Sequence, residues 1–407
     1  MSPMSHASSP ESGELVGRDP ATGAALRVAF AGGLISEISE PADGEADHWI
    51  APGLIDLQVN GYHGFDVNEP SLREATIVSL IDALARVGVT TVVPTLITAP
   101  PDQLLASLAT IARARGTSRD LGHAVPHVHV EGPFLSDQDG PRGVHDARHI
   151  RPPSVDEVIG WQRASGGLVG MITISPHWPG SAEFIRAVTG LGIRVAIGHT
   201  HATPDQVHSA VAAGATVSTH LGNGAHAALP RHPNYIWAQL ADDRLRAGLI
   251  ADGHHLPADT FKAMVRAVGL DRAHLVSDAT ALAGMPPGRY QTPVGDTVDL
   301  STDGRLSHVG TPYLAGAARG LNECVAIATD LGDLTLNDAL TLATGNPARL
   351  LPAGGPPRGV LAPGAASDLI TFDFAPGDQA LRIKKVHGAG PRRPPGFSGL
   401  DGDFASF

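Results

Sequence analysis

The feature that most constrains the fold of this 407-residue chain is a regular alternation of short apolar segments with longer amphipathic ones. Eight apolar segments have the length and composition of strands: 54–60, 90–95, 126–131, 168–175, 194–199, 216–220, 245–252 and 274–278. Helix-like stretches separate them, and the stretch 203–213 begins with Thr-Pro-Asp, which places proline at the first helical position. Eight strands that alternate with helices predict an α/β fold, the (β/α)8 TIM barrel.

The two ends of the chain have a different texture. Residues 14–50 and 358–390 contain short β-type runs broken by Gly and Asp, and we expect them to pair into one small β-sandwich domain. The barrel then occupies residues 51–357. Residues 1–13, rich in Ser, Pro and Glu, are expected to be disordered, and residues 391–407 to form an irregular tail.

Composition narrows the class of protein. The formal net charge of -12 argues against a general affinity for nucleic acid or for anionic membranes. A single cysteine, Cys324, supports neither a disulfide framework nor a cysteine zinc site. The N-terminal residues do not resemble a secretory signal, and no apolar run is long enough to cross a bilayer. These features lead us to expect a cytoplasmic enzyme.

The third apolar segment ends in His127-Val-His-Val-Glu131-Gly-Pro133. Alternate residues of a strand share a face, so His127, His129 and Glu131 point the same way. The proline has no N–H for a sheet and ends the strand. Glu131 therefore lies where a barrel enzyme places catalytic or metal-binding groups. Taken alone, this segment is equally consistent with a glutamate that points to water.

Other proposed strands end in side chains of the same kind, namely His199, His220 and Asp278. A single histidine at a strand end is more often a structural residue than a metal ligand. Two histidines and a glutamate at one rim instead match the His2Glu pattern of a catalytic zinc site with one open position. Such a metal acidifies its bound water and polarises a carbonyl, and a nearby carboxylate such as Asp278 can then act as acid and base.

A set of motifs in the same order resembles the amidohydrolase superfamily and, more narrowly, the N-acetylglucosamine-6-phosphate deacetylase family. These motifs are Pro52-Gly-Leu-Ile-Asp56, the Glu131 strand, Gly198-His199, Thr219-His220-Leu221, Ile250-Ala-Asp-Gly253 and Ser277-Asp278-Ala-Thr280. The resemblance covers about residues 14–390. It implies a hydrolase that removes the acetyl group of N-acetylglucosamine 6-phosphate, with Glu131, His199 and His220 as metal ligands and Asp278 as the catalytic acid and base.

The resemblance also implies one divalent metal, with Zn²⁺ preferred and Fe²⁺, Mn²⁺ or Co²⁺ compatible with the same ligands. It implies a homodimer in which Arg231 reaches the phosphate bound by the neighbouring subunit. It assigns substrate contacts to three further loops and to the residues beside Arg231. The predicted substrate-binding residues are Val144, His145, Asn223, Gly224, Arg231, Asp252, Gly253, His254, His255, Leu314, Ala315 and Gly316.

The sequence departs from the superfamily pattern at several positions. Gln58-Val-Asn60 replaces the usual His-x-His of the first strand, and the fourth strand has no lysine, which favours one metal over two. Ser175-Pro-His177 stands where many deacetylases have Ala-Pro-Glu, and the segment 221–230 differs from the common phosphate loop. Two alternatives follow: a related N-acyl amino-sugar deacetylase, galacto-configured or non-phosphorylated, or a non-catalytic binding protein. His127 and His129 are expected to lie deeper, as packing residues.

Overall fold

The computed structural model describes residues 12–388 apart from 43, 45, 293–296 and 312. The expectations for residues 1–13 and 391–407 therefore fall outside the described residues, except that residues 12 and 13 belong to the first strand. None of the helices in the described part of the chain combines the length and the apolar character needed to cross a bilayer.

Eight parallel strands form the barrel, in the order in which they occur in the chain. They are β5 (Leu54–Val59), β8 (Val89–Ile97), β9 (Val128–Glu131), β10 (Val169–Ile174), β11 (Arg194–Ile197), β12 (Val217–Ser218), β13 (Arg246–Leu249) and β14 (Ala273–Leu275). Each overlaps one of the predicted segments, although the bounds of several differ by a few residues, so the predicted TIM barrel is confirmed. Parallel strands are buried on both faces, and this is why each is a nearly continuous apolar run.

The barrel closes between its first and last strands. The backbone N–H of Asp278 donates to the carbonyl of Gln58 at 3.0 Å, and that of Asn60 donates to the carbonyl of Ala279 at 2.9 Å. A parallel bridge joins Val59 and Ala279 at the same place. Closure therefore brings the end of β5 beside the residues that follow β14, which are more than two hundred positions later in the chain.

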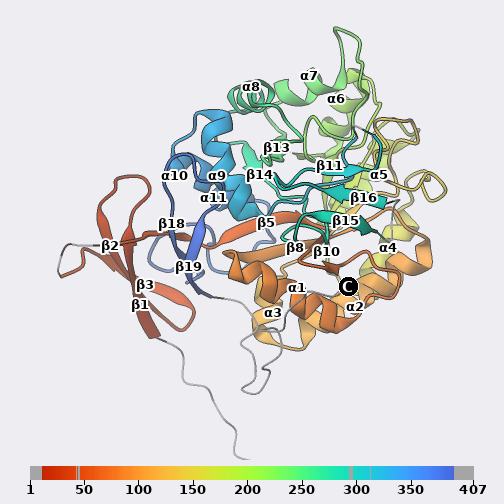
Figure 1. Cartoon of the computed structure of the whole chain (residues 1–407). Helices are drawn as coiled ribbons and strands as arrows, with labels where there is room; N and C mark the ends of the chain where they lie inside the picture. The colour runs from red at the N-terminus through yellow and green to blue at the C-terminus, as the bar shows by residue number, and fades with distance from the viewer. Residues whose placement is uncertain (1–11, 43, 45, 293–296, 312, 389–407) are drawn as a thin grey trace, which may run out of the picture.

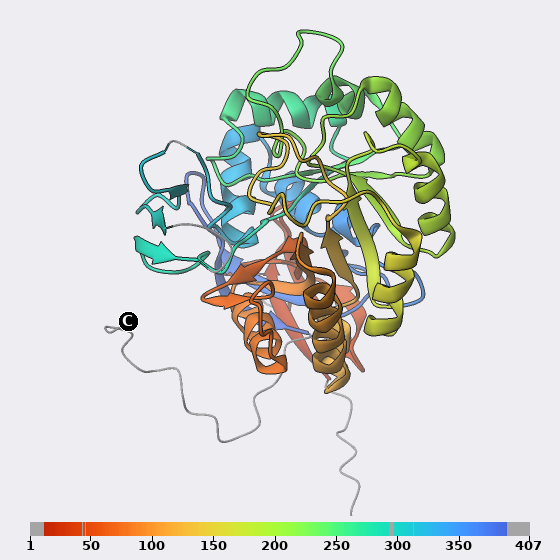
Figure 2. The same ribbon diagram turned by 90° about the vertical axis from the view of Figure 1, so that its right-hand side faces the viewer.

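Helices surround the strands, as Figure 2 shows. They are α1 (Glu74–Arg86), α2 (Pro101–Gly116), α3 (Arg119–Ala124), α4 (Val155–Ser165), α5 (Ser181–Gly190), α6 (Pro204–Ala213), α7 (Tyr235–Ala241), α8 (Ala258–Val268), α9 (Leu321–Gly332), α10 (Leu336–Ala343) and α11 (Gly345–Ala348). Helix α6 begins as predicted, with Pro204 in its first turn and a capping box between Thr203 and Gln206. Helices and strands share one apolar core, in which Trp161 of α4 is fully buried.

Both ends of the chain contribute to a separate six-stranded sheet beside the barrel (Figure 1). Its strands are β1 (Ser12–Arg18), β2 (Ala25–Ala31), β3 (Leu34–Ser39), β4 (Trp49–Pro52), β18 (Leu369–Asp373) and β19 (Arg382–His387). Strand β18 pairs with β4, and this joins the two ends of the chain. The predicted association of the two ends is thus observed, whereas the division into domains at residues 51 and 357 stays a prediction.

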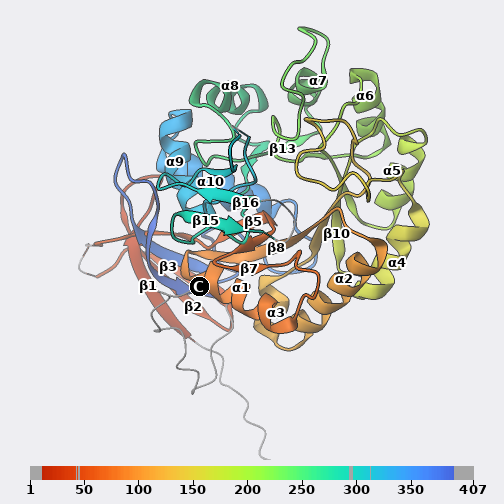
Figure 3. The ribbon, with the colours of Figure 1, turned by 45° about the vertical axis from the view of Figure 1, so that its right-hand side comes forward.

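A second small sheet was not predicted. Strands β15 (Gly288–Gln291), β16 (Thr297–Leu300) and β17 (Leu306–His308) form an antiparallel three-stranded sheet between β14 and α9, visible in front of the barrel in Figure 3. A further hairpin, β6 (Gly61–Tyr62) and β7 (Phe65–Asp66), follows β5. The three-stranded sheet leads into the predicted substrate loop, since Ser307 of β17 bridges Leu314.

Candidate active site

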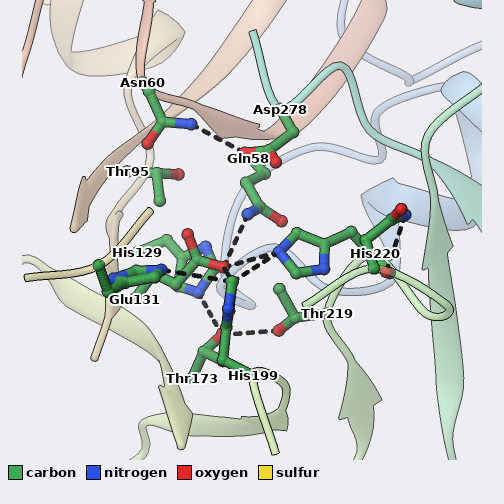
Figure 4. Close-up of polar contacts among 12 residues, drawn as sticks. Gln58, Asn60, Thr95, His129, Glu131, Thr173, His199, Thr219, His220 and Asp278 are labelled. Atoms are coloured by element: carbon green, nitrogen blue, oxygen red, sulfur yellow. Dashed lines mark hydrogen bonds and ion pairs between the residues drawn. The ribbon is translucent and has the colours of Figure 1, made fainter. Parts of the chain in front are cut away.

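The predicted metal and catalytic residues lie at the same rim of the barrel, where the strands end (Figure 4). Glu131 is the last residue of β9. His199, His220 and Asp278 come just after β11, β12 and β14, and all three have positive φ angles, of 46°, 25° and 50°. Residues with a Cβ rarely adopt this region, and such strain concentrates at functional sites. The positive φ angles therefore indicate that these three positions are functional ones.

Glu131, His199 and His220 are buried, and their ligand atoms lie within 4.8 Å of one another. Glu131 Oε1 is 3.0 Å from His220 Nε2 and 3.3 Å from His199 Nε2. The two histidine Nε2 atoms are 3.0 Å apart. Within the described residues, no other group of three or more His, Cys, Asp or Glu side chains meets this criterion. The predicted ligand set is thus assembled in the folded chain.

The protonation of His199 suits a metal ligand. Its Nδ1 lies 2.8 Å from the carbonyl oxygen of Pro141. A carbonyl can only accept, so Nδ1 carries the proton and the lone pair of Nε2 points at Glu131 and His220. His220 Nδ1 has no hydrogen-bond partner in the described residues. The donor set of two imidazoles and one carboxylate fits zinc and related divalent ions.

The charge distribution of this group also favours a cation. Burial alone would raise the pKa of Glu131, but hydrogen bonds and charge from His199 and His220 hold it well below its ordinary value. Burial opposes protonation of His220, yet the hydrogen bond and charge of Glu131 raise the pKa of His220 to about 9. The buried carboxylate therefore requires a positive charge beside it, which a divalent cation would supply.

The side-chain amides of Gln58 and Asn60 hold the carboxylates of Glu131 and Asp278 in place. In the sequence, these two residues stood out only because they differ from the superfamily pattern. Gln58 Nε2 donates to Glu131 Oε1 at 3.1 Å, and Asn60 Nδ2 donates to Asp278 Oδ1 at 2.8 Å (Figure 4). Gln58 and Asn60 alternate along β5 and its end, so both side chains enter the barrel. The spacing of two residues between Gln58 and Asn60 is the sequence signal that could have predicted that both side chains face the site.

Asp278 lies beside the ligand group rather than within it. Although part of its surface is open to solvent, desolvation of the carboxylate raises the pKa of Asp278 to about 6. The charge of His220 opposes this rise, whereas the charge of Glu131 adds to it. The charge of His255 and the hydrogen bond from Asn60 lower the pKa, as His220 does, because they favour the ionised carboxylate. Asp278 therefore carries a carboxylate whose pKa is close enough to neutrality for proton transfer in both directions.

His145 enters the site from the loop after β9. The backbone N–H of Thr98 donates to His145 Nδ1 at 3.4 Å, and the Thr98 hydroxyl lies 2.9 Å from the same atom. His145 Nε2 therefore carries the proton, and it lies 3.3 Å from His199 Nε2. Burial lowers the pKa of His145 to about 3, so its ring is a neutral hydrogen-bond donor at the site. Neighbouring Val144 is 43% exposed.

Below the ligands, a chain of polar side chains supports the site. His129 Nε2 lies 2.7 Å from the Thr173 hydroxyl, which lies 2.6 Å from the Thr219 hydroxyl (Figure 4). His129 is buried, and burial lowers its pKa to about 4. His127 is also buried, at the start of the same segment. Both are therefore buried residues that contribute no atom to the ligand group, as expected from the sequence.

The segment after β12 contributes Asn223, Gly224 and Arg231. Asn223 Nδ2 donates to the carbonyl of His220 at 3.2 Å. Gly224 packs against His199, since a Cβ there would lie 2.6 Å from His199 Nδ1. Arg231 is exposed and has no hydrogen bond or ion pair within the described residues. It belongs to the loop before α7, which projects beyond the helices in Figures 1 and 3.

The loop after β13 contains a linked aspartate and histidine. Asp252 Oδ1 accepts the backbone N–H groups of His254 and His255, while its Oδ2 is 2.6 Å from His255 Nδ1. Both carboxylate oxygens of Asp252 are therefore engaged by His254 and His255, and they orient the His255 ring. Gly253 makes the turn between Asp252 and His255, with a φ angle of 80°. His254 Nε2 lies 2.9 Å from the carbonyl oxygen of Asp303.

The last predicted loop, Leu314-Ala315-Gly316, borders the end of the eighth strand. Ala317 bridges Ala279, the residue after Asp278. A Cβ at Gly316 would lie 2.5 Å from Thr280 Cγ2, so glycine permits this close approach. The structure thus brings the loops of His145, Asn223, His255 and Leu314 around one rim, while Arg231 lies on the projecting loop.

Comparison with known proteins agrees with this geometry. A sequence model described as the amidohydrolase family matches residues 49–401. N-acetylglucosamine-6-phosphate deacetylase of Danio rerio is 33% identical over 359 residues, which cover 84% of this chain and 83% of that protein. This chain belongs to the amidohydrolase family, among the N-acetylglucosamine-6-phosphate deacetylases.

Other amidohydrolases show the same likeness. N-acetylgalactosamine-6-phosphate deacetylase of Escherichia coli O157:H7 is 30% identical, over 80% of this chain and 83% of that protein. A solved structure of a Mycobacterium smegmatis N-acetyl-D-glucosamine-6-phosphate deacetylase variant, in complex with N-acetyl-D-glucosamine-6-phosphate, superposes with a TM-score of 0.80. That structure is 28% identical, and the match covers 93% of this chain and 98% of the other.

Proposed function

We propose that this amidohydrolase cleaves the acetamide of N-acetylglucosamine 6-phosphate with water, giving glucosamine 6-phosphate and acetate. The observation that carries the proposal is the buried group of Glu131, His199 and His220 with the Asp278 carboxylate beside it. The activity of the Danio rerio relative and the sugar phosphate held by the Mycobacterium smegmatis structure support the choice of substrate.

Glu131, His199 and His220 would hold one divalent metal ion, for which we propose zinc because of the borderline-soft imidazole ligands. When bound, the ion supplies a Lewis acid that polarises the acetyl carbonyl and acidifies the hydrolytic water. Gln58 keeps Glu131 oriented toward the two histidines through its amide N–H.

Asp278 moves the protons of the reaction. Its Oδ1 accepts the Asn60 amide, which leaves Oδ2 to take a proton from the water and to deliver it to the departing amine nitrogen. Its pKa of about 6 allows both steps near neutral pH. His145, a neutral donor at Nε2, would donate a hydrogen bond to a substrate oxygen, either the acetyl carbonyl or a hydroxyl. His255, oriented by Asp252, would bind the sugar.

Replacing Asp278 by Asn tests the chemistry. Asp278→Asn keeps the size and the packing but cannot accept a proton, so we expect turnover to fall by about 100-fold or more, with the metal content unchanged. Asp330→Asn, a change at an exposed position on α9, is the matched control and should leave turnover unaltered. Normal acetate release by Asp278→Asn would refute the assignment.

We also propose that the protein is a homodimer and that Arg231 binds the substrate phosphate of the partner subunit. Its exposed position on a projecting loop, without an intramolecular partner in the described residues, supports this proposal. A guanidinium makes two parallel hydrogen bonds to a phosphate, and hydrogen bonds to charged groups contribute about 1.5–3 kcal/mol. Arg231→Ala should therefore raise KM by about 10- to 150-fold, whereas Arg186→Ala on α5 should not.

Mixing two defective variants separates action within a subunit from action across the dimer. In a mixed dimer of Arg231→Ala and Asp278→Asn subunits, one site would combine an intact Asp278 with an intact Arg231 from the other chain. We expect activity to appear on mixing and subunit exchange. No recovery, although the mixed dimer is present, would show that Arg231 does not act across an interface.

A galacto-configured or non-phosphorylated amino sugar remains the second candidate substrate, since the Escherichia coli relative acts on the galactosamine compound. Acetate release from a panel of N-acetyl amino sugars, with and without the 6-phosphate, decides between them. A cytoplasmic location is part of the proposal, because a charged sugar phosphate does not cross a bilayer unaided. A preference for non-phosphorylated sugars in this panel would contradict both the proposed phosphate site and the proposed cytoplasmic location of the protein.

A further inference from the structure

The projecting loop that carries Arg231 is closed at its neck by contacts between its two ends (Figure 3). His226, near the start of the loop, donates its backbone N–H to the Tyr235 hydroxyl at 2.9 Å, and His226 Nδ1 lies 3.1 Å from the same oxygen. Tyr235 begins α7 and is buried, with 5% of its surface exposed. The two residues are nine positions apart in the chain, so the segment between them starts and ends at one fixed point.

A third residue fixes the orientation of the His226 ring. His226 Nε2 lies 3.0 Å from Gln138 Oε1. An amide oxygen only accepts, so His226 Nε2 carries the proton, and the lone pair of its Nδ1 accepts the O–H of Tyr235. Gln138 belongs to the loop after β9, and this loop packs closely on the neck: a Cβ at Gly140 would lie 3.0 Å from the carbonyl oxygen of Ala225. Two hydrogen bonds to the Tyr235 oxygen therefore hold the neck, and the loop after β9 supports it.

Inside the neck, the buried side chain of Asn234 holds the turn on which Arg231 lies. Asn234 Nδ2 donates to the carbonyl of Pro230 at 3.0 Å, and this bond closes a turn over the exposed residues 231–233. Asn234 Oδ1 accepts two backbone N–H groups in the first turn of α7, so the same side chain also caps that helix. Before the turn, Leu229 packs against the main apolar core. The backbone of Arg231 is thus held on both sides.

We propose that His226, Asn234 and Tyr235 form a brace that positions the arginine of this loop to bind the substrate phosphate. The inference rests on the phosphate-binding role proposed above for Arg231. Within the part of the chain that the structure describes, no hydrogen bond or ion pair holds the Arg231 side chain, so the reach of its guanidinium depends on where its backbone lies. A loop that is ordered beforehand loses less conformational freedom on binding. The brace therefore raises the affinity for the phosphate and not the rate of the chemical step.

The first test is the kinetics of Tyr235→Phe with N-acetylglucosamine 6-phosphate. Phenylalanine keeps the buried ring and removes the oxygen that makes both hydrogen bonds of the neck. We expect KM to rise by about 3- to 10-fold, which corresponds to the net contribution of about one hydrogen bond. The turnover number kcat and the metal content should be unchanged, because the oxygen has no part in the ligand group.

A second variant, Asn234→Ser, releases the turn within the neck. Serine retains an oxygen that can cap α7 but lacks the amide that donates to Pro230, so the helix is preserved while the turn loses its closing bond. We expect KM to rise by a similar factor, again with kcat unchanged. Asn337→Ser, at a position on α10 outside this loop, is the matched control and should leave KM unaltered.

Combination with Arg231→Ala separates the positioning of Arg231 from a general loss of structure. If the brace acts through Arg231, Tyr235→Phe should have no further effect on KM once Arg231 is absent. Equal effects of Tyr235→Phe with and without Arg231 would overturn the inference, and so would a KM that stays unchanged in both Tyr235→Phe and Asn234→Ser. An unchanged KM in Arg231→Ala alone would instead refute the proposed phosphate site, and the brace together with it.

Discussion

The hydrogen bond from Asn60 to Asp278 gives the sharpest test of how this site sets its proton affinity. Asn60 Nδ2 lies 2.8 Å from Asp278 Oδ1 and favours the ionised carboxylate. Asn60→Ala removes the donor without placing a new charge in the site. Burial, which raises the pKa of Asp278, would then act with less opposition.

The size of the effect follows from the strength of a hydrogen bond to a charged group, about 1.5–3 kcal/mol. Since one pKa unit corresponds to about 1.36 kcal/mol, loss of the bond should raise the pKa of Asp278 by about 1–2 units. Asp278 must be ionised to accept a proton from water. The acidic limb of kcat/KM should therefore move to higher pH by the same amount, because a higher pKa leaves less carboxylate at a given pH.

The assay is acetate release from N-acetylglucosamine 6-phosphate across the pH range in which the metal stays bound. A bound cation lowers the pKa of Asp278 in both proteins, so the difference between their profiles is the quantity to compare. Gln58→Ala is the control, because it removes an amide from Glu131 and not from Asp278. An acidic limb that stays in place in Asn60→Ala, or moves equally in Gln58→Ala, would refute the reasoning.

Three further predictions concern the metal and the stability of the barrel. His220→Gln should lower metal content and turnover together, as measured by elemental analysis and acetate release, and zinc should not restore wild-type activity. Trp161→Ala should reduce the free energy of unfolding by about 3–5 kcal/mol in urea, because the side chain is fully buried and stacks on Phe134; a smaller loss would mean that the site collapses around the cavity. Thr203→Ala removes the N-cap of α6 and should cost about 1 kcal/mol in the same assay.

The barrel was predictable because its strands are buried on both faces. Such strands are short apolar runs whatever their neighbours are, so the run around residues 194–197 is recognisable without knowledge of its partners. The ligand group was predictable for a related reason. Parallel strands place their C-terminal ends at one rim, so Glu131, His199 and His220 had to lie near one another once the barrel was accepted.

The small sheet β15–β17 was not predictable in the same way. Strands such as β15 (Gly288–Gln291) are mostly exposed, and they lack the apolar run that marks a barrel strand. Their pairing depends on packing around Leu282 and Ala318, which are residues from the two flanking segments. Local sequence carries little information about a short exposed strand whose stability comes from contacts outside it.

By itself, the sequence determined the eight alternating strands and the three side chains, those of Glu131, His199 and His220, that meet at one rim of the barrel. Tertiary structure decided which side chains hold these groups in place. Asn60 reaches Asp278 across 218 positions of sequence. Contacts of this kind depend on closure and register, which fix distances to a fraction of an ångström, whereas a residue pattern fixes only the face on which a side chain lies.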